Sequence, residues 1–130
     1  MRASVSLIMV LFLLFLTACN SNSAITTIKD GNYILEKTDS EAAISPQVTI
    51  SGNDISFSYD PLNSYLPVGV YTIEEKMLTM MTHDGLYKYV FNIDGDKLVF
   101  QKNISSEVNL TDYRLGISIA DKAEFKLKEN

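Results

Sequence analysis

Three groups of residues in this chain have side chains that could carry chemistry. They are the single cysteine, Cys19, the single histidine, His83, and the two carboxylates of Asp94-Gly95-Asp96. A thiol can be acylated, oxidised or bound to a metal. Imidazole transfers protons near neutral pH, and clustered carboxylates bind hard cations such as Ca²⁺. The sequence around each group indicates which of these chemistries to expect.

Cys19 lies at the end of an export leader. Arg2 precedes an apolar run over residues 5–16, and Thr17 and Ala18 come directly before the cysteine. A basic start, an apolar stretch and small residues in this order are typical of a signal peptide. Leu16-Thr17-Ala18-Cys19 also resembles the bacterial lipobox, in which the thiol is diacylated and the chain is cut before the cysteine. We expect residues 1–18 to be a signal peptide and Cys19 to be lipidated.

Two other interpretations of the leader fit less well. The apolar run has twelve residues, whereas a membrane-spanning helix needs about 20. An unmodified Cys19 would be an exposed thiol without a second cysteine for a disulfide. Two acyl chains on one cysteine give stable anchoring. The sequence therefore predicts attachment to the extracellular face of the cell membrane through a diacylglyceryl group on Cys19.

The charge balance argues against several classes of partner. The net charge is −5 and becomes −6 once the leader is removed, because Arg2 is its only charged residue. Nucleic-acid binding needs clustered Lys and Arg, and an acidic chain is repelled by anionic lipid, so we expect neither mode of binding. An acidic surface fits a cationic ligand or metal ions, but solubility is the simpler explanation.

The rest of the chain predicts one all-β domain over residues 31–130, joined to Cys19 by a polar tether within residues 19–30. Runs of β-branched and aromatic residues alternate with turn signals at regular spacing. Close turns indicate an antiparallel meander of seven or eight short strands, closing into a small barrel or a sandwich. Short helices could lie at residues 41–44 and 112–119. The expected strands are residues 33–35, 48–50, 55–59, 70–73, 77–82, 86–93, 97–101 and 123–128.

The other chemical candidates fit turns better than catalytic or metal sites. His83-Asp84-Gly85 is a turn sequence, and a metal site there would need carboxylates for every other ligand. Asp94-Gly95-Asp96 fits a type I′ hairpin better than a calcium loop, which needs more ligands at set intervals. Nucleophile-elbow, phosphate-loop, zinc-protease and dinucleotide motifs do not occur. We expect no enzyme, no metal and no cofactor.

The loop 60–67 contains the candidate binding residues Leu62, Tyr65 and Leu66 between two prolines. These side chains could fold inward and plug one end of the barrel, which is favoured because small domains need buried apolar groups. They could instead present a preorganised apolar surface to a partner. The same two alternatives, core packing or an exposed binding surface, apply to three aromatic residues on one face of a predicted strand, Tyr87, Tyr89 and Phe91. Core packing is favoured for these residues.

Several segments together resemble a module of Firmicute cell-surface proteins. The module occurs in small lipoproteins and in the extracellular tails of BlaR-type sensor metallopeptidases. The resemblance spans residues 31–127, carries no catalytic motif, and implies a single β domain on a Gram-positive cell surface. The segments that carry it are residues 57–71, Met77-Leu78-Thr79, Asp84-Gly85, Tyr89-Val90-Phe91, Leu98-Val99-Phe100, Ser105-Ser106 and Ala123-Glu124-Phe125-Lys126.

Two function classes follow from the sequence. The first is a membrane-anchored, non-catalytic binding or sensing module whose barrel interior is filled. The alternative is a lipocalin-like carrier that holds a small apolar molecule in a cavity lined by Tyr and Met. Whether the barrel interior is filled or contains a cavity therefore distinguishes the binding module from the carrier.

Overall fold

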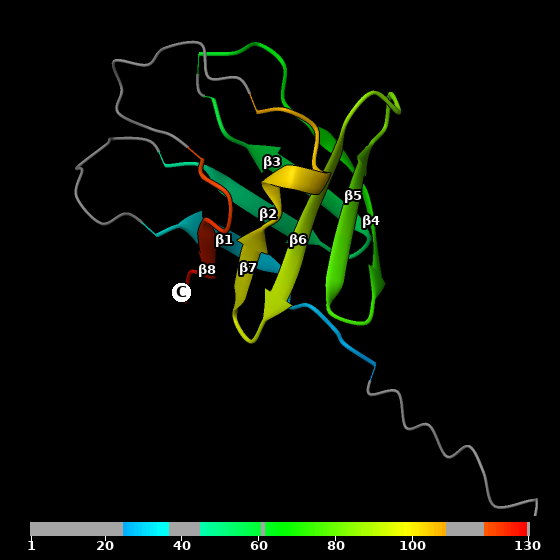
Figure 1. The fold of residues 1–130 in the computed structure, drawn as a ribbon, viewed down its shortest axis with the longest axis vertical. Coiled ribbons are helices and arrows are strands. Elements are labelled where there is room, and N and C mark those ends of the chain that lie inside the picture. Colours follow the sequence, from blue (N-terminus) through cyan, green and yellow to red (C-terminus); the bar gives the residue numbers. More distant parts are fainter. Residues whose placement is uncertain (1–24, 37–44, 61, 109–118, 130) are drawn as a thin grey trace, which may run out of the picture.

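The chain folds into a closed eight-stranded antiparallel β-barrel (Figure 1). The structure is a computed structural model that describes residues 25–36, 45–60, 62–108 and 119–129. Each strand pairs with the next, and β8 pairs with β1 to close the sheet. The all-β meander is confirmed, and the barrel is the architecture that forms. Its strands are β1 (Gly31–Leu35), β2 (Gln47–Ser51), β3 (Asp54–Ser58), β4 (Val68–Glu74), β5 (Met77–Thr82), β6 (Lys88–Asp94), β7 (Lys97–Phe100) and β8 (Glu124–Leu127).

The strands form where apolar and polar residues alternate. In β3, Ile55 and Phe57 are buried while Ser56 and Ser58 are partly exposed, as expected for successive side chains on opposite faces. Every expected run overlaps one of the observed strands. A short 3₁₀ helix, η2 (Lys102–Ile104), was not expected. The possible helix at 41–44, and all but the last residue of the one at 112–119, lie outside the described residues.

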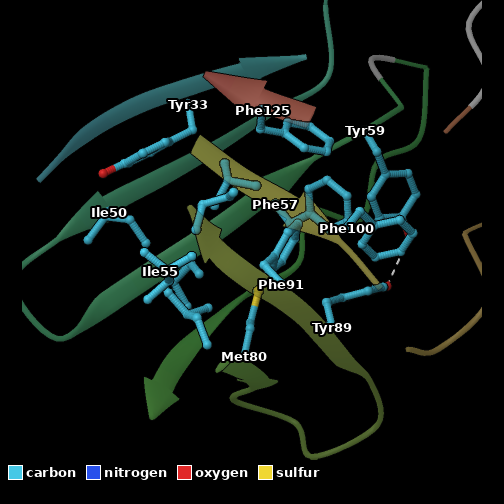
Figure 2. Packing of buried hydrophobic residues seen from close by; sticks show 14 of the residues in the cluster. Tyr33, Ile50, Ile55, Phe57, Tyr59, Met80, Tyr89, Phe91, Phe100 and Phe125 are labelled. Atoms are coloured by element: carbon cyan, nitrogen blue, oxygen red, sulfur yellow. Dashed lines mark hydrogen bonds between the residues drawn. The ribbon is translucent and has the colours of Figure 1, made fainter. Parts of the chain in front are cut away.

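Aromatic rings fill the barrel interior (Figure 2). Phe57 lies at the centre, with its ring centroid 5.1–5.8 Å from five other rings. Most of these pairs meet edge to face, an arrangement that adds about 0.5–1.5 kcal/mol per pair beyond the burial of area. The five neighbouring rings are those of Tyr59, Tyr89, Phe91, Phe100 and Phe125.

Three two-residue turns connect the strand pairs β2–β3, β4–β5 and β6–β7. The first central residue of each has a positive φ: 59° at Gly52, 56° at Glu75 and 61° at Gly95. The second central residue of each has a negative φ, which matches type II′. Asp94-Gly95-Asp96 is thus a hairpin, as predicted, but the type I′ assignment was wrong because that type needs a positive φ at Asp96 as well.

The two ends of the barrel differ in their connections. The three short turns share one end, which we call the hairpin end. The longer connections, which leave β1, β3, β5 and β7, share the other, which we call the long-loop end (Figure 1). The segment before β1 is fixed at the hairpin end, where Asp30 Oδ2 accepts a hydrogen bond from Gly52 N at 3.1 Å. Ile28 packs against the core from the same segment.

Two local features adjust the sheet near the long-loop end. Gly69 of β4 lies so close to β5 that a Cβ there would be 1.9 Å from the carbonyl oxygen of Met81. At the edge between β6 and β7, β6 extends past the end of β7. Two serines, Ser105 and Ser106, take the place of the β7 backbone there. Val90 N donates to Ser105 Oγ at 2.9 Å and Lys88 N donates to Ser106 Oγ at 2.8 Å. The serine pair therefore satisfies backbone groups that β7 does not reach.

Candidate functional site

The candidate residues of loop 60–67 lie on the surface of the long-loop end. The exposed fractions of Leu62, Tyr65 and Leu66 are 58%, 38% and 52%. The favoured expectation that they plug the barrel is wrong, because all three side chains are exposed, whereas Tyr59, just before the loop, belongs to the core. Tyr59 is buried, and its hydroxyl lies 3.3 Å from that of Tyr89 (Figure 2). The alternative, a surface loop, is the arrangement that the structure has.

Short-range hydrogen bonds shape the loop that carries these residues. Asp60 Oδ1 accepts from Leu62 N at 3.0 Å, and Asn63 Oδ1 accepts from Tyr65 N at 3.0 Å. Asp and Asn side chains favour such contacts with a backbone N–H two residues later. The loop thereby holds Tyr65 in position without placing its ring in the core.

Tyr65 is tied to the β5–β6 connection through Asp84. Its hydroxyl donates to Asp84 Oδ2 at 2.5 Å, while Oδ1 accepts from Thr82 Oγ1 at 2.6 Å and from Leu86 N at 3.0 Å. The hydrogen bonds from Thr82 and then Tyr65 lower the pKa of Asp84, because they favour the carboxylate. The same bond to Asp84 raises the pKa of Tyr65. Asp84 is therefore a carboxylate and Tyr65 a neutral phenol at neutral pH.

Thr82 explains why β6 begins later than expected. Its side chain is buried, and its hydroxyl accepts from Tyr87 N at 3.0 Å. These contacts keep Leu86 and Tyr87 in the turn, so that β6 starts at Lys88. The expectation that Tyr87 shares the core with Tyr89 and Phe91 was therefore wrong for Tyr87, which is 37% exposed.

Four tyrosine rings run from the barrel interior to this surface. Tyr59 lies 6.1 Å from Tyr89, which lies 6.4 Å from Tyr87 in a stacked arrangement. Tyr87 in turn lies 5.6 Å from Tyr65, with an interplanar angle of 53°. Tyr89 is fully buried, and this burial raises the pKa of its hydroxyl strongly. Tyr65 and Tyr87, by contrast, are partly exposed to solvent. The outer pair thus rests on a rigid aromatic core.

Further exposed apolar side chains lie near the tyrosine pair. Leu86, in the connection between β5 and β6, is 71% exposed. Val70 and Met81 are paired across β4 and β5 and are also exposed. We call Leu62, Tyr65, Leu66, Leu86 and Tyr87, with Asp84 between them, the long-loop surface. Sequence reasoning missed Leu86 and Asp84, although Leu86 could have been suspected as an isolated apolar residue after a turn glycine.

The remaining chemical candidates have ordinary positions. His83 lies in the β5–β6 turn, where its backbone N–H donates to Val68 O at 3.0 Å. Asp94 and Asp96 belong to the β6–β7 hairpin at the opposite end of the barrel. Within the described ranges, no three His, Cys, Asp or Glu side chains are grouped so that they could hold a metal ion.

The membrane-attachment residues predicted from the sequence lie outside the described residues. These residues are the predicted leader, 1–18, and the predicted lipidation site, Cys19. In the part of the chain that the structure describes, no helix has the length and apolar character required to cross a bilayer. The lipidation of Cys19 stays a prediction.

Comparison with protein-family models, with curated proteins and with solved structures finds no match to this chain.

Proposed function

We propose that this protein is a lipoprotein of the extracellular face of the cell membrane, anchored through a diacylglyceryl group on Cys19, that acts as a non-catalytic binding module. The Gram-positive assignment rests on the resemblance to Firmicute surface modules. The observation that supports the binding role most directly is the long-loop surface. Rigid loops that present exposed aromatic and aliphatic side chains are common binding sites.

The placement of the two barrel ends supports this proposal. The segment that leads back toward Cys19 lies against the hairpin end, where Asp30 accepts from Gly52 N. The long-loop surface is at the opposite end of the barrel (Figure 1). An anchor on the hairpin side would leave the long-loop surface directed away from the membrane and accessible to a partner.

The interior of the barrel favours a binding module over a carrier. Phe57, Phe91, Phe100 and Phe125 are fully buried and in ring-to-ring contact. Their edge-to-face packing occupies the volume in which a carrier would hold its ligand. Met80 is fully buried in the same cluster and lies beside Phe91 (Figure 2).

Metabolic labelling with a fatty acid tests the anchor. Wild-type protein should incorporate the label and stay with the cell membrane. The Cys19→Ala variant should lose the label and appear in the medium. An unlabelled wild-type protein, or a Cys19→Ala variant that stays membrane-bound, would contradict the proposed anchor.

Site-specific photo-crosslinking in the native host tests the binding role. A photoreactive amino acid at Leu86 should capture a discrete partner, because this side chain is exposed within the long-loop surface. The same amino acid at Glu75, exposed in a turn of the hairpin end, is the matched control. Capture from Glu75 alone would place the binding surface at the wrong end, and capture from neither position would refute the proposed function.

A further inference from the structure

We propose that Tyr65, Tyr87 and Asp84 form a recognition site for a basic side chain, above all an arginine, presented by a partner protein. This inference rests on the proposed function, because it names the chemistry that the long-loop surface binds. It draws on the geometry of the tyrosine pair, on the charge of Asp84 and on the apolar residues around them.

Tyr65 and Tyr87 place two partly exposed aromatic side chains beside a carboxylate. The rings of Tyr65 and Tyr87 lie 5.6 Å apart at 53°, so their faces are not stacked on each other. Each of the two residues is more than one-third exposed. A cation over the face of such a ring is attracted by its quadrupole, and arginine is the side chain most often found there.

Among the residues that the structure describes, no basic side chain pairs with the negatively charged Asp84. The ion pairs of the described residues join Lys97 to Glu36 and to Glu124, on another part of the barrel. Three groups donate hydrogen bonds to the Asp84 side chain, from Thr82, Leu86 and Tyr65, and all three are neutral. A carboxylate has about four acceptor positions, so Oδ2, which accepts only from Tyr65 among these donors, can take one more hydrogen bond.

The fixed position of Asp84 suits recognition better than a mobile surface carboxylate would. Its side chain is held from both loops, by Tyr65 on one and by Thr82 and Leu86 on the other. A charge that is already in place loses little side-chain entropy when a partner binds. Guanidinium can stack on an aromatic face while its N–H groups reach the carboxylate, which ammonium does less well.

The surroundings favour a protein partner over the cationic headgroup of a lipid. Leu62, Leu66 and Leu86 are each more than half exposed around the polar centre, and they can cover the apolar residues that flank a basic side chain. The surface also lies at the end of the barrel opposite the segment that leads to Cys19. The net charge of −5 favours a basic partner at long range.

Two matched peptides test this inference on the full chain purified from membranes in detergent. Acetyl-Leu-Arg-Leu-amide is the probe, and acetyl-Leu-citrulline-Leu-amide is its neutral counterpart of similar shape. With the tyrosine rings isotopically labelled, NMR should show saturable shifts of the Tyr65 and Tyr87 signals with the arginine peptide. The citrulline peptide should bind at least about five-fold more weakly, since it lacks the charge.

Variants separate recognition from loop structure. Tyr87→Leu should weaken arginine-peptide binding about two- to five-fold, the loss expected for one exposed cation–aromatic contact. Asp84→Asn should weaken it by a similar factor while the dispersion of the other tyrosine signals is retained. Asp94→Asn removes a carboxylate at the hairpin end and should leave binding unchanged.

Three outcomes would overturn the inference. Equal binding of the citrulline peptide would show that charge is not recognised, and stronger shifts with tetramethylammonium than with arginine would indicate a lipid headgroup. Absence of any shift at Tyr65 and Tyr87 would overturn it as well. If a partner is still captured from Leu86 in that case, the proposed function stands and only the cationic chemistry fails. If none is captured, both fail.

Discussion

Replacing Gly69 by alanine tests the close approach of β4 and β5. The added Cβ would lie 1.9 Å from the carbonyl oxygen of Met81, 2.7 Å from its carbonyl carbon and 2.8 Å from Thr82 Cα. All three atoms belong to the backbone, so no side-chain rotation relieves the contact. Ordinary contact begins at 3.4 Å, and β4 must therefore move away from β5 by about 1.5 Å.

The cost follows from the interactions that such a shift disrupts. Gly69 pairs with Thr82 and Val70 pairs with Met81, so at least two positions of the ladder separate. Each backbone hydrogen bond contributes about 0.5–1.5 kcal/mol net, and the buried Thr82 hydroxyl loses its alignment with Tyr87. We expect Gly69→Ala to lower the free energy of unfolding by about 2–4 kcal/mol.

Urea unfolding followed by circular dichroism and tyrosine fluorescence measures this effect. Gly52→Ala is the matched control, because a Cβ at Gly52 meets nothing within 4 Å and only its φ of 59° is unfavourable. That strain costs about 1–2 kcal/mol. A Gly69→Ala variant as stable as the wild type, or more stable than Gly52→Ala, would refute the argument from close approach.

Three further predictions concern the core, a turn and the effect of pH. Phe57→Ala should lower the free energy of unfolding by about 3–5 kcal/mol in urea titrations, because it leaves five rings around a void. Its control, Leu62→Ala on the surface, should change the free energy of unfolding by less than about 0.5 kcal/mol. Glu75→Gly should raise the thermal midpoint by the equivalent of about 0.5–1 kcal/mol, since glycine relieves the positive φ of 56° at that position; a lower midpoint would contradict this. Burial raises the pKa of Tyr89 above its ordinary value of 10.0, so its stabilising effect is complete below about pH 10 and is lost as the pH rises further. Urea midpoints measured above about pH 10 test this: the midpoint of Tyr89→Phe should fall with rising pH less steeply than that of the wild type. Equal slopes for the two proteins would show that Tyr89 is not responsible for the pH dependence.

The strands could be predicted because their signal is local. Alternation of apolar and polar residues, as in Ile55-Ser56-Phe57-Ser58, determines which side chains face the core. The choice of a barrel could not be made in this way. It depends on the pairing of β1 with β8, whose partners Tyr33 and Leu127 are far apart in the sequence and carry no mutual signal.

The candidate site was predictable only in part. The loop residues Leu62, Tyr65 and Leu66 were recognised as unusual, but their exposure depends on which residues fill the barrel in three dimensions, and Tyr59 rather than the loop is buried. The bond between Tyr65 and Asp84 joins residues nineteen positions apart in two different loops. A local signal for Asp84 did exist, since an Asp before a turn glycine commonly accepts a backbone N–H two residues later, as it does here from Leu86.

The pairing of β1 with β8 also constrains when the barrel can form. A chain is synthesised from its N-terminus, so β1 emerges first and its partner β8 last. The hairpins β2–β3, β4–β5 and β6–β7 have two-residue turns and can pair locally as they emerge. Until Phe125 and its neighbours are available, the growing sheet retains two open edges that can pair with other chains. The sheet therefore stays open to such pairing until residues 124–127 have joined β1.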